Sequence, residues 1–144
     1  MIKYQRITHD VDVLIPTLVD QFKGYREVDV LYLYGSRAGG RISPLSDVDL
    51  AVLVSKSLNK KEWYELLLAL MGVAASTLKT DEVDLQILNN IPLQAQYSIL
   101  KNKKMLFCRS ESRRTEYEEE VVVRYLDFRP ILDAQYEAMY RRIA

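Results

Sequence analysis

The sequence predicts a single α+β (α/β-like) domain with a long C-terminal helical tail, and three observations support that class. The chain has 144 residues, of which 49% are hydrophobic and 28% charged, as is typical of one globular domain that buries a core. Short runs of β-branched and aromatic residues alternate with segments of helical periodicity. No repeat or linker interrupts them. We therefore expect one domain over 1–144, with its core at about 10–108 and the tail at about 110–144.

The first part of the chain is expected to contain one helix and two strands. Apolar residues at helical spacing over 10–23 predict a helix, with Pro16 marking either the start of its regular part or a kink. The run "VDVLYLY" (28–34) is a strand pattern that stops at Gly35, and "DVDLAVLV" (47–54) is a second one. The loop between them is rich in glycine and leaves room for a short helix.

The second part repeats this alternation. Residues 59–78 have the i, i+3, i+4 spacing of an amphipathic helix. The run "EVDLQIL" (82–88) predicts a third strand, and "KMLFC" (104–108) a short fourth one. A helix is expected over about 92–100, because proline suits the first helical position.

The tail is predicted to be helical throughout. Its apolar residues recur every three or four positions: Tyr117, Val121, Tyr125, Phe128, Leu132, Tyr136, Met139 and Ile143. Pro130 lies inside this stripe and should kink the helix or split it. The stripe is too long for so small a core to cover completely, so we expect part of it to dock a partner.

Composition excludes several classes of function. The chain has 20 Lys and Arg against 20 Asp and Glu, so it lacks the basic excess of proteins that grip nucleic acid, and no direct nucleic-acid binding is expected. With His9 and Cys108 as the single residues of their types, neither an internal disulfide nor a zinc cluster can be built. No signal-peptide pattern or long apolar run is present, which predicts a cytoplasmic protein without membrane contact.

Acidic residues lie where a buried strand is expected. Side chains alternate along a strand, so Asp47 and Asp49 share one face, with Cα atoms roughly 6.5 Å apart given a rise of about 3.3 Å per residue. Two carboxylates at that spacing suit one hard cation or a pair of them, Mg²⁺ or Mn²⁺ rather than zinc. Asp84 lies in a similar apolar setting on the third predicted strand and is a candidate for the third acid of such a site.

A Gly-Ser turn follows the first predicted strand. Its backbone N–H groups and the Ser36 hydroxyl are suited to phosphate oxygens, and Gly35 allows a ligand to approach the backbone closely. Arg37 and Arg41 offer cations for a phosphate chain, and Ser46, directly before the first aspartate, is grouped with this nucleotide-binding set. A phosphate cradle beside metal-binding carboxylates is the equipment for phosphoryl or nucleotidyl transfer.

The order of these features carries more weight than any one of them, since a single Gly-Ser or Asp-x-Asp is common. The pattern resembles that of the nucleotidyltransferase superfamily that includes DNA polymerase beta: Gly-Ser, then ten residues, then Asp-x-Asp. The stretch "LYGSRAGG…SDVDLAVLV" is similar to minimal nucleotidyltransferases of bacteria and archaea, over about 10–108. The segment "RYLDFRPILDAQYEAMYRRI" (124–143) is also similar to the tail of the minimal nucleotidyltransferase antitoxins that pair with HEPN ribonuclease toxins.

The resemblance implies a nucleotidyltransferase fold, with a small mixed β-sheet flanked by helices, and a role for each motif. Asp47 and Asp49 would bind two Mg²⁺ ions, Asp84 would be the third carboxylate and general base, and Gly35 and Ser36 would hold the phosphates of ATP. The implied reaction transfers AMP to a tyrosine of a HEPN toxin, within a hetero-oligomer, and releases pyrophosphate. Many relatives carry a basic residue where this chain has Gly39, which puts nucleotide affinity in question.

Two alternatives remain open at the level of sequence. The chain could silence a toxin by contact alone, with a vestigial site. It could instead modify a small molecule, as aminoglycoside nucleotidyltransferases do, although that chemistry usually needs a second substrate-binding domain. The base of the nucleotide, the acceptor tyrosine and the stoichiometry of the complex are not encoded in any motif.

Overall fold

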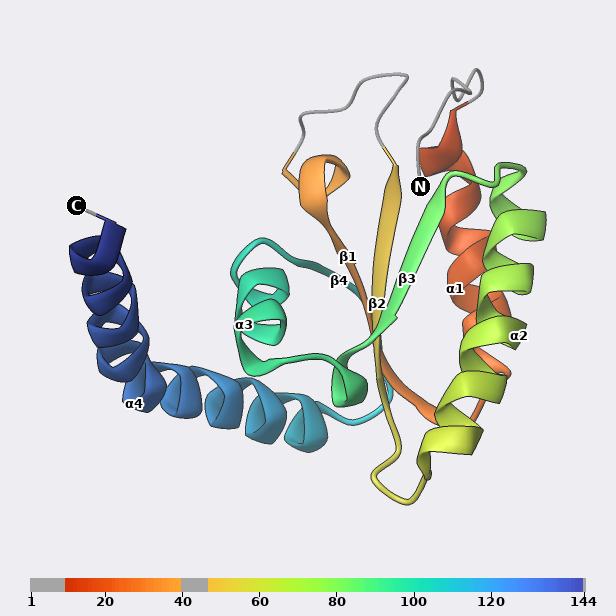
Figure 1. Ribbon diagram of the computed structural model, residues 1–144. Coiled ribbons are helices and arrows are strands. Elements are labelled where there is room, and N and C mark those ends of the chain that lie inside the picture. The colour runs from red at the N-terminus through yellow and green to blue at the C-terminus, as the bar shows by residue number, and fades with distance from the viewer. Residues whose placement is uncertain (1–9, 40–46, 144) are drawn as a thin grey trace.

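The computed structural model describes residues 10–39 and 47–143, which form a four-stranded sheet with helices on both faces (Figure 1). The strands are β1 (Val28–Tyr34), β2 (Val48–Val54), β3 (Val83–Ile87) and β4 (Lys104–Cys108). The helices are α1 (Ile15–Lys23), α2 (Lys60–Leu78), α3 (Leu93–Lys101) and α4 (Glu111–Ile143). Short 3-10 turns, η1 (Val11–Leu14), η2 (Gly35–Arg37) and η3 (Leu88–Asn90), complete the described part.

The sheet is mixed, as the resemblance implied. Its strand order is β3-β2-β1-β4, with β1 antiparallel to both β2 and β4, and β2 parallel to β3. A parallel pair needs a long crossover, and α2 supplies it between β2 and β3. As a result, the end of β1 and the starts of β2 and β3 meet at the same end of the sheet.

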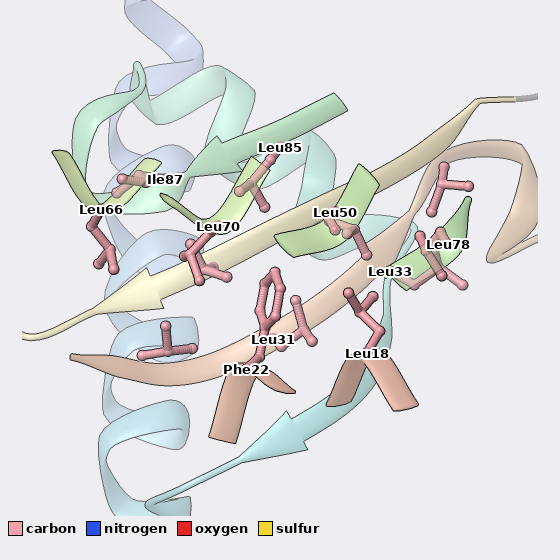
Figure 2. Close-up of a cluster of buried hydrophobic side chains, with 14 of the residues drawn as sticks. Leu18, Phe22, Leu31, Leu33, Leu50, Leu66, Leu70, Leu78, Leu85 and Ile87 are labelled. Atoms are coloured by element: carbon pink, nitrogen blue, oxygen red, sulfur yellow. The ribbon is translucent and has the colours of Figure 1, made fainter. Parts of the chain in front are cut away.

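One face of the sheet is closed by α1 and α2. Alternate residues of the strands, among them Leu31, Leu50 and Leu85, point into an apolar layer that also contains Leu18 and Phe22 of α1 (Figure 2). The buried residues of this layer are all apolar, and most are completely inaccessible to solvent.

The opposite face is covered by α3 and the first part of α4. It buries a second and smaller cluster: Val30, Tyr32, Ala51, Leu53, Leu88, Ile99, Leu100, Tyr117 and Val121. This cluster includes two tyrosines, and each of their hydroxyls is hydrogen-bonded: Tyr32 donates to Glu118 (3.2 Å) and Tyr117 donates to Gln96 (2.8 Å). The second face is therefore a mixture of apolar packing and buried polar contacts.

Local signals set the helix boundaries. The Asn59 side chain accepts from the Glu62 N–H (2.9 Å) while the Glu62 side chain accepts from the Asn59 N–H (3.0 Å), a capping box that fixes the start of α2. Pro92 was expected to be the first residue of its helix. It is instead the N-cap, so α3 begins one residue later than expected, at Leu93. The first predicted helix is divided into η1 and α1, with Pro16 in the first turn of α1, where a missing N–H costs nothing.

The C-terminal tail is one helix of 33 residues that continues through Pro130. Of the two outcomes that the sequence left open at Pro130, a split is wrong, and in Figure 1 the two ends of the continuous helix run in different directions, as a kink requires. The first turns pack on the sheet through Tyr117 and Val121, whereas the large apolar residues farther along are mostly exposed. Among the residues that the structure describes, no helix combines the length and apolar character needed to cross a membrane.

Candidate active site

The predicted acids lie at the end of the sheet where β1 finishes and β2 and β3 begin. Tyr34, the last residue of β1, is opposite Asp49 in the β1–β2 ladder, and Asp49 is opposite Asp84 in the β2–β3 ladder. Because side chains alternate, Asp47, Asp49 and Asp84 belong to the face that α3 and α4 cover, and Tyr34 packs on that cluster. The register of the sheet thus brings side chains from three strands together in one row.

Gly35 is required by the position of Asp49. Its φ angle is +74°, a left-handed conformation that is strained for any residue with a Cβ atom. A Cβ atom added at Gly35 would lie only 2.3 Å from an Asp49 carboxylate oxygen. The glycine of the Gly-Ser motif therefore makes room for the aspartate as well as for a ligand.

Asp84 is engaged by its neighbours. The Tyr34 hydroxyl hydrogen-bonds its carboxylate, and the Gln86 side-chain amide donates to it at 3.3 Å. Burial raises the pKa of Tyr34, and the charges of Asp84 and Asp49 raise it further, so this phenol keeps its proton and acts as the donor. Sequence reasoning missed Tyr34, although its position directly before the Gly-Ser motif was a usable signal.

The donor set suits a hard divalent cation. Asp47 and Asp49 are partly exposed carboxylates on one face, with no nitrogen or sulfur ligand in the motif, and such oxygens favour Mg²⁺ or Mn²⁺. Within 10–39 and 47–143, no group of three or more acidic, histidine or cysteine side chains is arranged to hold a metal ion. Binding of one ion by all three aspartates would therefore need a rearrangement of their side chains.

A pocket of about 430 Å³ opens beside the Gly-Ser turn. Among the described residues, one wall consists of Gly35, Ser36, Ala38 and Gly39, and the other of Asn102 and Lys103 from the loop between α3 and β4. The volume is within the range of small-molecule sites. Sequence reasoning missed the second wall, because nothing in the spacing of the chain indicates which distant loop the sheet brings to this turn.

The predicted cations are placed differently from one another. The Arg37 side chain is only 6% exposed, and its guanidinium lies 4.0 Å from the Asp12 carboxylate in η1. It is therefore turned toward the N-terminal segment rather than standing open to the pocket. Arg41 and Ser46 lie outside the described residues.

Comparisons with known proteins identify the family and the fold. A family model described as "Polymerase beta, Nucleotidyltransferase" matches residues 16–112, which include the Gly-Ser turn and all three aspartates. A search of curated protein sequences found no significant match.

Solved structures show the same fold. A chain of a toxin–antitoxin complex with AMP-PNP superposes with a TM-score of 0.64 at 23% identity, over 92% of this chain and 97% of that one. A chain from a tri-AMPylated Shewanella oneidensis HEPN toxin in complex with MNT antitoxin gives 0.63 at 19%, over 93% and 98%. A chain of an MntA–HepT toxin–antitoxin complex gives 0.58 at 21%, over 92% and 97%.

Proposed function

Because the chain belongs to the polymerase beta nucleotidyltransferase family, we propose that it is a Mg²⁺-dependent protein adenylyltransferase that acts as an antitoxin. Its substrate is ATP, and its acceptor is a tyrosine of a cognate HEPN ribonuclease toxin, which the AMP group silences. The observation that carries the proposal is the row formed by Gly35, Asp49 and Asp84 at one end of the sheet. The solved complexes of the same fold include a toxin that bears AMP, which supports the choice of acceptor.

Each motif then has a role in the transfer. Ser36 and the backbone N–H groups of the Gly-Ser turn bind the phosphate chain at the wall of the pocket. Asp47 and Asp49 hold Mg²⁺, which when bound neutralises the charge that develops on the phosphates. The phenolic oxygen of the acceptor forms a bond to the α-phosphorus of ATP, its proton passes to Asp84, and the bond from that phosphorus to pyrophosphate breaks.

The second part of α4 is the proposed docking element for the toxin. Beyond Val121 the helix is long, and its large apolar side chains, among them Ile131, Tyr136 and Met139, are about half exposed. Contiguous exposed apolar side chains of this kind mark interaction sites. A toxin bound along this helix would form the hetero-oligomer.

The test is a transfer assay with the product of the neighbouring gene. Purified protein, Mg²⁺, ATP and the toxin are mixed, and mass shifts are mapped on the toxin by mass spectrometry. We expect an AMP adduct on a toxin tyrosine that is lost with Asp84→Asn and kept with Asp81→Asn. Asp81 is the matched control because it is exposed and lies just outside β3.

A contact-only antitoxin is the second candidate, and two observations favour it. The described residues hold no preformed group of three acids, and Arg37 is directed to Asp12 rather than to the pocket. A toxin that is bound and inhibited without an adduct, whatever the nucleotide, would establish this alternative. Modification of a small molecule in the absence of any toxin would instead support an antibiotic-type transferase.

A further inference from the structure

The pocket beside the Gly-Ser turn has one charged residue among the described residues that line it, and that residue is Lys103. The other lining residues are glycines, Ala38, Ser36 and Asn102. A triphosphate carries several negative charges, and a bound phosphate chain needs cations as well as N–H donors. Because Arg37 faces Asp12, the described part of the wall offers its positive charge through Lys103.

Lys103 is held in place by α4. Its ammonium forms an ion pair with Glu118 and lies 5.6 Å from the centre of the Tyr32 ring. Its side chain is 23% exposed, so it is ordered by these contacts and still reaches the solvent of the pocket. Burial lowers the pKa of Lys103, and the nearby charge of Arg114 lowers it further.

Glu118 is shared between Lys103 and two further donors. Its other carboxylate oxygen also accepts from Arg114 at 2.7 Å and from the Tyr32 hydroxyl at 3.2 Å, so its charge is shared among three donors. A lysine ammonium has three N–H donors, and the ion pair uses one of them. Further donors of Lys103 are thus available to a phosphate oxygen without loss of the contact that positions the side chain.

We propose that Lys103, which lines the same pocket as Ser36, is a ligand for the phosphate chain of the nucleotide and is positioned by Glu118 of α4. The proposal rests on the proposed function for the identity of the ligand, a nucleoside triphosphate. It assigns the positive charge of the described part of the site to a loop more than sixty residues from the Gly-Ser turn in the sequence. It also links the pocket to the helix that is proposed to dock the toxin.

The test measures the binding of a non-hydrolysable ATP analogue with Mg²⁺ by calorimetry, and that of adenosine as a ligand without phosphates. Lys103→Met should weaken binding of the analogue about tenfold or more, the usual effect of losing a hydrogen bond from a charged group, and leave adenosine binding unchanged within about twofold. Lys103→Arg should keep most of the affinity. Lys104→Met, a change at an exposed neighbour that does not line the pocket, should have no effect.

The outcomes separate this inference from the proposed function. Equal affinity of the wild type and Lys103→Met for the analogue, or an equal loss for the analogue and adenosine, overturns the role of Lys103. Binding that depends on Lys103 without any transfer to the toxin contradicts the proposed function alone. A wild-type protein that does not bind the analogue overturns both. Lys103→Gln, checked for folding by circular dichroism, serves as a second variant.

Discussion

The two faces of the sheet are built from the same strands but are different in character. On the α1 and α2 side, alternate residues such as Leu31, Leu50 and Leu85 form a layer whose buried members are all apolar (Figure 2). On the α3 and α4 side, the intervening residues form a smaller core that gives way to Asp49 and Asp84 at one end. The larger apolar core and the candidate acids thus lie on opposite faces of the sheet. Substitutions one residue apart on a strand should therefore have different consequences.

The largest effect is expected at the acidic end of the second face. Asp47→Asn and Asp49→Asn should each reduce AMP transfer at least about a hundredfold, because charge stabilisation of the transferring phosphate depends on these carboxylates. The melting temperature should stay close to that of the wild type, since neither residue belongs to the apolar core. Transfer of labelled AMP and circular dichroism are measured together. Near-normal transfer by both variants would contradict the metal site.

The neighbouring residue on the other face should show the reverse. Leu50 follows Asp49 in the sequence and is completely buried. Leu50→Ala should lower the free energy of unfolding by about 2–5 kcal/mol, because packing contacts are lost and a cavity is left. Urea unfolding gives this value. At a temperature where the variant is folded, its transfer rate should be within a few fold of the wild type. A stable but inactive variant would break the division between the faces.

Gly35→Ala tests the point where the turn meets the second face. The left-handed φ should cost about 1–2 kcal/mol of stability, and the new methyl group would displace the Asp49 carboxylate. We therefore expect a loss of transfer that exceeds what the change in stability explains. Gly72→Ala in α2 is the control, since a Cβ there meets nothing within 4 Å and the residue lies outside the site. Full activity of Gly35→Ala would show that Asp49 does not need its present position.

The smallest effect concerns alkaline pH. Burial raises the pKa of Tyr32 and of Tyr117 above the value of about 10 for an unfolded chain, so both phenols stay neutral in the folded protein. The stability that they contribute is complete below pH 10 and is lost as the pH rises toward their folded pKa, by at most about 1.4 kcal/mol per pH unit for each. Tyr32→Phe should therefore make the decline of the unfolding free energy between pH 10 and 11 less steep. An unchanged slope would contradict the burial of this phenol in the folded state.

Much of the fold was predictable because it depends on local patterns. The strands over 28–34 and 104–108 have the boundaries expected from their residues, and the helix expected over 59–78 is observed over Lys60–Leu78. What the sequence could not predict depends on the packing of distant segments. No spacing rule brings Lys103 to the same pocket as Ser36, and none indicates that Arg37 would turn toward Asp12.

The parallel pairing of β2 and β3 has a consequence for folding fidelity. The register that places Asp84 opposite Asp49 is also the one that buries Leu85 and Ile87 in the first core. A slip of one residue would exchange the two faces of β3. Leu85 and Ile87 would then lie on the second face, and Asp84 would leave the site. The packing of the core therefore also fixes the alignment of the acids. Recovered transfer activity in a refolding experiment would report that β3 has paired in its correct register.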